Sequence, residues 1–173
     1  PKPVAIPMSN SPVCEGEALE LFVDCMTGTQ YEWQGPNGFS SSLCNPVIPN
    51  ATADLMDEPF RVRILVDGCW SDEALITVNV KEKPKQPFAV NFGPYCSSSQ
   101  DVTVGVSAAS ATPGATYVWV VEGTDVALGQ ATGLTFTIPN AAQYGNGTTS
   151  FVVVATLDGC VSENSVATNV EMN

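Results

Sequence analysis

The sequence predicts an all-β protein built from two tandem β-sandwich domains. Three observations carry this prediction: a composition rich in Thr, Val, Ser, Gly and Asn, runs of alternating apolar and polar residues, and a set of motifs that occurs twice. Alternation with a period of two indicates a strand with one buried face, and short strands separated by turn residues are typical of sandwiches. No stretch shows the periodicity of an amphipathic helix, so we expect little helix.

Four motifs define an internal repeat. The stretches SPVC, YEW, VIPNA and FRVRILVDGC of the first half return in the same order as GPYC, YVW, TIPNA and FVVVATLDGC. The segment KEKPKQP, residues 81–87, combines charges with two prolines, which is typical of a short, semi-stiff linker. We therefore expect one domain over residues 1–82 and a second over 83–173.

The strands follow in chain order within each repeat. Leu19, Leu21 and Val23 share one face of an early strand. The YEW strand comes next, and residues 60–66 then alternate apolar with polar side chains. An Asp-Gly pair reverses the chain after this strand, which is a strong hairpin signal. The second repeat carries the equivalent segments.

Each repeat also has a tyrosine and a tryptophan two residues apart on one face of its third strand. These four aromatics are the candidate core residues: Tyr31, Trp33, Tyr117 and Trp119. The tryptophan stays in both copies while the segment after it changes from QGPNGF to VVEGTDV. This pattern favours packing inside the sandwich over a sugar-stacking platform, and the GPNG segment then supplies a turn.

The chain has six cysteines and no histidine. No Cys-x-x-Cys pair occurs, so a zinc site would lack its usual ligands, and an even count favours three disulfides in an oxidising compartment. The register of the repeat predicts the pairs Cys14–Cys69 and Cys96–Cys160. It leaves Cys25–Cys44 as a pair private to the first repeat.

Composition disfavours several function classes. The net charge of −12 argues against nucleic-acid binding, because phosphate neutralisation requires Lys and Arg, and it disfavours anionic membrane surfaces. No apolar run approaches the roughly 18 residues of a spanning helix, so no membrane insertion is expected. Without histidine, Ser-His-Asp and Cys-His catalysis cannot operate, and no phosphate-binding fingerprint occurs. We expect no enzyme activity, with a glycosidase-type carboxylate pair as the open exception.

Calcium is the one cofactor that stays open, and no other cofactor is expected. Asp54, Asp57 and Glu58 cluster in one loop of the first repeat and offer the oxygen ligands that calcium prefers. The corresponding AAQYGNG stretch of the second repeat carries no acid, and no D-x-D-x-D-G spacing exists. The sequence therefore predicts no defined metal site.

Trp70 is the candidate contact residue. It follows the cysteine of the hairpin in the first repeat, and Val161 takes its place in the second. Two interpretations stay open: the indole covers a Cys14–Cys69 bond, or it is exposed and contacts a carbohydrate or protein.

Four segments resemble the immunoglobulin-like and PKD-like repeats of large secreted Bacteroidota surface proteins: residues 14–17, 31–40, 45–50 and 62–69. The resemblance implies immunoglobulin-like sandwiches, export by the type IX route, and a role in gliding adhesins, surface filaments or multi-domain enzymes. The standard immunoglobulin topology places the two cysteine positions of one repeat at opposite poles. Either the first strand carries its cysteine along the last strand, or the topology differs.

We therefore predict a non-catalytic extracellular segment of a larger cell-surface protein, adhesive or filament-forming. The first residue is Pro1 and no sorting domain is recognisable, so we expect a processed product or a fragment. Its expected partners are neighbouring repeats or subunits of the same protein, with surface glycans or proteins as further candidates. The alternative is a carbohydrate-binding accessory module of a secreted multi-domain enzyme.

Overall fold

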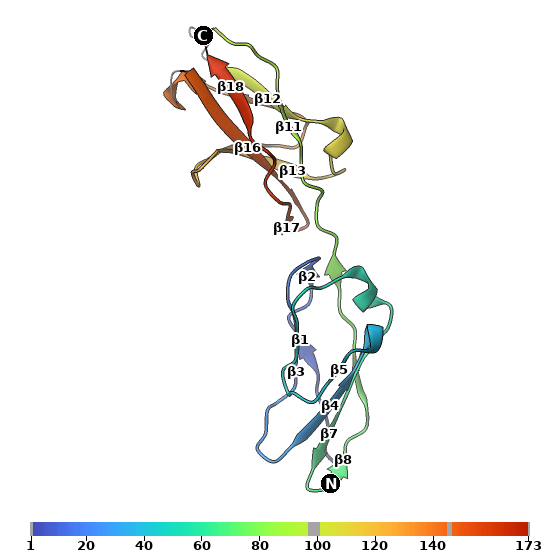
Figure 1. Cartoon of the computed structure of the whole chain (residues 1–173). Coiled ribbons are helices and arrows are strands. Elements are labelled where there is room, and N and C mark those ends of the chain that lie inside the picture. Colours follow the sequence, from blue (N-terminus) through green and yellow to red (C-terminus); the bar gives the residue numbers. More distant parts are fainter. Residues whose placement is uncertain (1, 97–100, 145–146, 173) are drawn as a thin grey trace. The chain divides into compact units, whose positions relative to one another are not determined.

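The computed structural model describes residues 2–96, 101–144 and 147–172, which form β-strands joined by loops and short 3-10 turns (Figure 1). The chain divides into two compact units, Pro1–Glu82 and Lys83–Asn173. The division between them lies within the segment KEKPKQP, residues 81–87. Each unit is a sandwich of two sheets around its own core.

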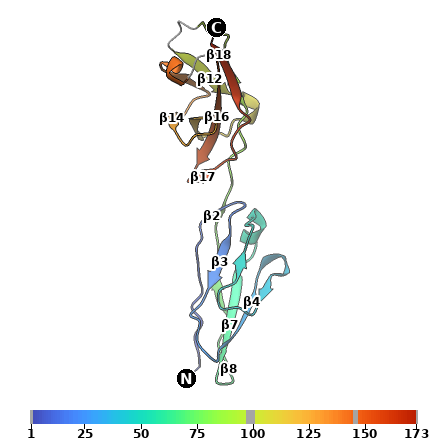
Figure 2. The same ribbon diagram turned by 60° about the vertical axis from the view of Figure 1, so that its left-hand side comes forward.

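Unit 1 encloses its core between two antiparallel sheets (Figure 2). The smaller sheet has the order β1 (Met8–Ser9), β3 (Leu19–Phe22), β6 (Val47–Ile48). The larger has the order β5 (Ser40–Ser41), β4 (Gln30–Gln34), β7 (Phe60–Val66), β8 (Cys69–Trp70), with β9 (Ala74–Ile76) also paired to β7. The last strand, β10 (Val80–Lys81), pairs in parallel with β2 (Val13–Cys14), and two 3-10 turns, η1 (Pro36–Gly38) and η2 (Ala53–Met56), complete the unit.

Unit 2 repeats this arrangement. Its smaller sheet has the order β11 (Ala89–Asn91), β12 (Val102–Val106), β15 (Thr135–Ile138). Its larger sheet has the order β14 (Ala127–Ala131), β13 (Thr116–Val121), β16 (Gly147–Leu157), β17 (Cys160–Val161), with β18 (Thr168–Met172) also paired to β16. The 3-10 turns are η3 (Ala108–Ser110) and η4 (Ala141–Tyr144).

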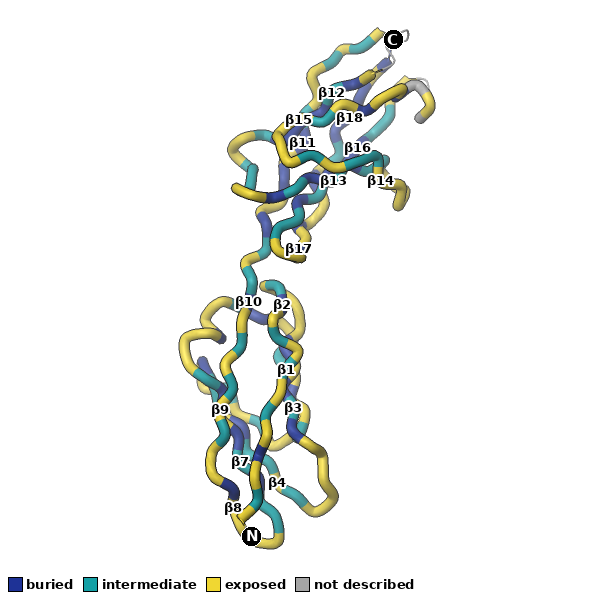
Figure 3. Tube along the Cα trace, turned by 180° about the vertical axis from the view of Figure 1, so that it is seen from behind, coloured by how far each residue is buried: buried dark blue, intermediate teal, exposed yellow. Residues whose placement is uncertain are grey.

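The repeat is visible in the strand register as well as in the sequence. Trp33 on β4 pairs with Val62 on β7, and Trp119 on β13 pairs with Val153 on β16. Both tryptophans lie in the core, with exposed fractions of 0% and 1%. Buried and exposed positions alternate along β3, as a strand with one face on the core requires (Figure 3). The tryptophan is thus the centre of each sandwich.

The two candidate core tyrosines pack on the same cores and also fasten a loop. Tyr117 is buried, whereas Tyr31 is half-buried against the core. The Tyr31 hydroxyl accepts a hydrogen bond from the Met26 N–H at 2.7 Å and donates to the Asp24 carbonyl at 3.1 Å. The Tyr117 hydroxyl accepts one from the Thr112 N–H at 2.9 Å. Each tyrosine therefore ties down the loop that precedes its own strand.

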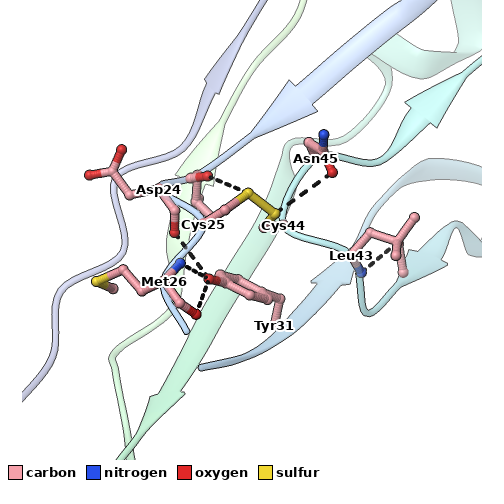
Figure 4. The surroundings of a disulfide bond; sticks show 9 residues. Asp24, Cys25, Met26, Tyr31, Leu43, Cys44 and Asn45 are labelled. Atoms are coloured by element: carbon pink, nitrogen blue, oxygen red, sulfur yellow. Dashed lines mark hydrogen bonds between the residues drawn. A yellow bond between two sulfur atoms is a disulfide. The ribbon is translucent and has the colours of Figure 1, made fainter. Parts of the chain in front are cut away.

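The Cys25–Cys44 disulfide forms as the sequence predicts. It joins the loop after β3 to the segment before β6, and the two Cα atoms lie 5.5 Å apart. A backbone hydrogen bond from the Val23 N–H to the Cys44 carbonyl, at 3.0 Å, lies beside it. Figure 4 shows the bond next to the Tyr31 hydroxyl, which makes three hydrogen bonds to the backbone of Asp24 and Met26, so one cluster secures this loop.

The predicted Cys14–Cys69 bond is wrong, because Cys69 is an exposed free thiol. Cys69 pairs with Val66 at the end of β7, whereas Cys14 pairs with Lys81. Lys81 comes five residues after Ile76, which pairs with the first residue of β7. The two cysteines are thus about eleven residues apart along the sheet, or ~36 Å at ~3.3 Å per residue, whereas a disulfide needs Cα atoms within roughly 7 Å. Figures 1 and 2 show β2 and β8 at opposite ends of unit 1.

The predicted Cys96–Cys160 bond is also wrong, since Cys96 is an exposed free thiol. Its neighbour Tyr95 bridges to Met172, which pairs with the first residue of β16. Cys160 pairs with the last residue of the same strand, ten residues farther on. This separation is ~33 Å, so no disulfide can join the two. The immunoglobulin topology, which places the two positions at opposite poles, is the interpretation that holds.

A buried serine interrupts the last strand of the larger sheet in each unit. Ser71 Oγ accepts a hydrogen bond from the Ile64 N–H at 3.0 Å and donates to the Asp72 carbonyl at 2.7 Å. Ser162 Oγ makes the same pair of bonds, to the Ala155 N–H at 2.9 Å and to the carbonyl of the next residue at 2.8 Å. The serine hydroxyl thus takes the place of one backbone acceptor between β8 and β9, and between β17 and β18, while the serine N–H still donates to the neighbouring strand.

Candidate functional site

The outer face of the larger sheet of unit 1 gathers the polar and aromatic side chains that could contact a ligand. Side chains alternate across a strand, so the residues between the core positions of β4 and β7 point outward. Glu32 and Arg63 are direct cross-strand neighbours, and Gln34 pairs with Arg61. Trp70 on β8 continues the same face next to Leu65. We call this set the outer face of unit 1: Glu32, Gln34, Arg61, Arg63, Leu65, Trp70 and Leu75.

Arg63 organises this face. Its Nη2 lies 2.6 Å from Glu32 Oε2, and its Nε donates a hydrogen bond to the same oxygen at 2.8 Å. Its guanidinium lies over the Trp70 ring, 4.5 Å from the centroid, a cation–π distance. Gln34 Nε2 donates to the other Glu32 oxygen at 3.3 Å. A planar indole is thereby held beside a carboxylate, an amide and a guanidinium.

Trp70 itself is partly exposed, with 36% of its surface accessible. It covers no disulfide, because Cys69 is a free thiol, so the first of the two sequence-based interpretations of Trp70 is wrong. Leu75, at 60% exposure, adds an apolar side chain to the same sheet face. The indole is therefore available for contact on the side that Arg63 leaves open.

The face is shallow, and Glu32 and Gln34 also line an open hollow of about 410 Å³ with Ser40, Ser41 and Ser42. The hollow among Glu32, Gln34, Arg61, Arg63 and Glu73 measures about 10 Å³, which is room for no more than a water molecule. Small-molecule sites are concave and bury most of the ligand's surface, which an open hollow does not do. This surface suits a ligand that lies across it, such as a glycan ring or another protein.

Unit 2 presents a different surface at the equivalent positions. The cross-strand pairs on the outer face of its larger sheet are Val118 with Val154 and Val120 with Val152. Val161, at 49% exposure, holds the place of Trp70. Valine occupies the positions that hold Glu32, Gln34, Arg61 and Arg63 in unit 1, whereas the core position is a tryptophan in both units. Trp70 was recognisable from the sequence, but Glu32 and Arg63 were not, because their shared face becomes evident only from the pairing of β4 with β7.

The acidic loop of unit 1 forms a local hydrogen-bond cluster. Asp54 accepts a hydrogen bond from Asn37 Nδ2 at 2.7 Å and another from the Thr52 hydroxyl. These two hydrogen bonds lower the pKa of Asp54 below its usual value, and the bond from Thr52 has the larger effect. Within the described residues, no group of three or more Asp, Glu, His or Cys side chains is arranged to hold a metal ion. Calcium binding by Asp54, Asp57 and Glu58 stays a prediction.

Within the described residues, no helix has the length and apolar character needed to cross a membrane. No protein-family model matches the sequence, and no curated protein matches it.

Solved structures match it in fold. A chain in the crystal structure of the mouse coronavirus receptor-binding domain complexed with its murine receptor aligns with a TM-score of 0.56 at 12% identity, over 98% of this chain and 100% of that one. Murine CEACAM1b gives 0.53 at 11% identity, over 98% and 100%. The fibronectin(III)-like modules of Clostridium thermocellum CbhA give 0.50 at 13% identity, over 97% and 94%. At such identities the likeness shows the fold alone: two tandem immunoglobulin-like β-sandwiches.

Proposed function

We propose that this chain is a non-catalytic repeat segment of a large extracellular surface protein, and that it acts as a disulfide-stapled structural or adhesive module. The observation that carries the proposal is the repeated core. Each unit buries a tryptophan at the same cross-strand register, so each is a complete sandwich. A series of self-sufficient sandwiches suits a protein whose role depends on reach and surface contacts.

Chemistry and composition support an extracellular setting. The Cys25–Cys44 bond requires an oxidising compartment in most organisms. The resemblance of residues 14–17 and 31–40 to Bacteroidota surface repeats adds a cell-surface location, export by the type IX route, and a place in an adhesin or surface filament. The shallow outer face of unit 1 suits contact with neighbouring subunits or with surface glycans and proteins. One structural neighbour comes from a complex between a viral receptor-binding domain and its receptor, a precedent for protein recognition by this fold.

Surface labelling tests the location. Antibodies raised against the purified chain should label intact cells of the species that encodes it, and brief protease treatment of those cells should remove the signal. A cytoplasmic protein of the same species is the matched control, since it should be labelled only after permeabilisation. Labelling of the chain that also requires permeabilisation would contradict the proposal.

Carbohydrate binding is the second candidate function, and the arrangement of Trp70, Arg63 and Glu32 favours it. We expect the full chain to bind a glycan from an array saturably, and Trp70→Ala to weaken that binding more than tenfold, because an aromatic anchor carries roughly 2 kcal/mol or more and 1.4 kcal/mol is tenfold. The melting temperature should hardly change, because Trp70 is partly exposed.

Val161→Ala is the matched control, because Val161 holds the equivalent place in unit 2. It should leave glycan binding unchanged. Equal losses in the two variants would show that the outer face of unit 1 is not the sugar site. An array without any saturable glycan would remove this candidate and leave the structural module.

A further inference from the structure

The described part of the chain has two exposed free thiols, Cys69 and Cys96, in addition to the disulfide-bonded pair Cys25–Cys44. An unpaired, exposed thiol in an oxidising compartment is a candidate for intermolecular pairing. Neither residue can reach the cysteine of its own unit that the repeat suggests as a partner, as the distances of ~36 Å and ~33 Å along the strands show.

Each free thiol lies at the end of its unit that is farther from the linker. In unit 1, the chain leaves through β10, and Cys69 lies at the other end of the β7 ladder. In unit 2, the chain enters beside the segment after β17, where Lys83 Nζ lies 2.6 Å from Glu163 Oε1 and Gln86 Nε2 donates to the Asn164 carbonyl at 2.6 Å. Cys96 lies at the opposite end, next to the bridge between Tyr95 and the last strand.

The repeat supplies an independent indication that these positions are built for disulfides. Cys160 occupies the place in unit 2 that Cys69 occupies in unit 1, and Cys14 occupies the place that corresponds to Cys96. The two residues at these equivalent places, Cys14 and Cys160, are disulfide-bonded. The free thiols are therefore members of a position type that does form disulfides in this chain.

We propose that Cys96 of one copy forms a disulfide with Cys69 of a second copy, so that copies join head to tail at their linker-distal ends. The inference rests on the proposed structural role and gives it a covalent connector. The reaction is thiol–disulfide exchange with a low-molecular-weight disulfide such as glutathione disulfide. Cys69 and Cys96 each lose a proton and together lose two electrons, one S–S bond forms, and glutathione disulfide is reduced to two glutathione thiols.

Such a contact is heterologous, because different residues of the two copies meet. A heterologous contact that does not close on itself propagates into an open chain, whereas an isologous contact stops at a dimer. The copies carry a net charge of −12 each, so added salt should speed their coupling by screening the repulsion.

Two complementary variants of the full chain test the orientation. Cys69→Ser keeps only Cys96 free, and Cys96→Ser keeps only Cys69 free. Both side chains are exposed, so thermal melts of the two variants should match that of the unchanged chain. Each protein is incubated in glutathione redox buffer and analysed by non-reducing electrophoresis, mass spectrometry and peptide mapping.

The unchanged chain should give a ladder of species in multiples of 18.2 kDa that dithiothreitol collapses to monomer. Each variant alone should stay monomeric, and an equal mixture of the two should stop at a dimer with a linked Cys69–Cys96 peptide. Homodimers of either variant that form as readily as the mixed dimer would overturn the head-to-tail assignment. An unchanged chain that ends as glutathione adducts, or that loses both thiols as a monomer, would overturn the connector itself. Surface labelling of cells is independent of this outcome, so failure here would leave the proposed location intact.

Discussion

Trp33→Ala should lower the free energy of unfolding of unit 1 by ~3–5 kcal/mol, the range for removing a large aromatic side chain from a core. Trp33 is completely buried among residues of both sheets. Its indole N–H meets no acceptor among the described residues, so the loss is one of packing and cavity formation rather than of a hydrogen bond. Such a loss is a large part of the roughly 5–15 kcal/mol that holds a typical domain together.

Denaturant unfolding of the full chain, followed by circular dichroism, measures this effect as a transition of unit 1 at lower denaturant. Asn37→Ala is the matched control in the turn behind the tryptophan. Asn37 has a positive φ of 57° and donates a hydrogen bond to Asp54 at 2.7 Å, so its loss should cost about 1 kcal/mol. A Trp33→Ala chain that unfolds at the same denaturant concentration as the unchanged chain would remove the tryptophan from the core and restore the platform interpretation.

Replacing Cys25 and Cys44 together by serine should lower the stability of unit 1 by ~3 kcal/mol. The bond closes a loop with a sequence separation of 19, and the chain-entropy model assigns about that much to a loop of this length. Unit 2 has its own core and shares none of these residues, so its transition should stay in place. Calorimetry of the full chain, which separates the two transitions, is the measurement.

Cys69→Ser is the control for this double variant, because it removes an exposed free thiol from the same unit. Its expected effect is within about 0.5 kcal/mol, as for other surface substitutions. If Cys69→Ser destabilised unit 1 as much as the double variant, Cys69 would belong to a structural bond, contrary to the structure. If the double variant unfolded like the unchanged chain, the loop would be held by the Tyr31 hydroxyl and its neighbours instead.

The fold class could be predicted from the sequence because the two repeats can be compared with each other. Trp33 and Trp119 kept their identity while the loops after them changed, and the structure places both at the same register opposite a valine. Burial of one face sets the alternation along β3 and β7, so composition and periodicity were sufficient for these strands. Such features depend on residues that are close together in the chain, so they can be recognised in the linear sequence.

The disulfides show where this comparison fails. The repeat shows that Cys14 corresponds to Cys96, but it does not show at which end of a sandwich either cysteine lies. That depends on the parallel pairing of β2 with β10 and on the hairpin of β7 with β8, which are contacts between residues far apart in the chain. Cys25–Cys44 was predictable because the second repeat has no counterpart for either residue.

The outer face of unit 1 was missed for the same reason. Trp70 stood out because its counterpart is a valine, but nothing in the linear sequence joins Glu32 to Arg63 across thirty residues. The antiparallel register of β4 and β7 makes them neighbours, and the chain's only two arginines then share one surface. A side chain that gains its role from cross-strand pairing becomes recognisable only when the register is known.

The interrupted last strands affect how such sandwiches avoid aggregation. A long, regular edge strand offers unpaired backbone groups to any similar strand nearby, and chains of repeats bring similar strands into frequent encounter. Here the edges of the larger sheets are poor templates. The buried serines break one edge into β8 and β9 in unit 1 and into β17 and β18 in unit 2, and β5 at the other edge of unit 1 has only two residues. In unit 2, β14 carries a register shift next to Trp119, and bulges of this kind discourage further pairing. Neighbouring units can therefore stay close together at high local concentration without adding strands to one another.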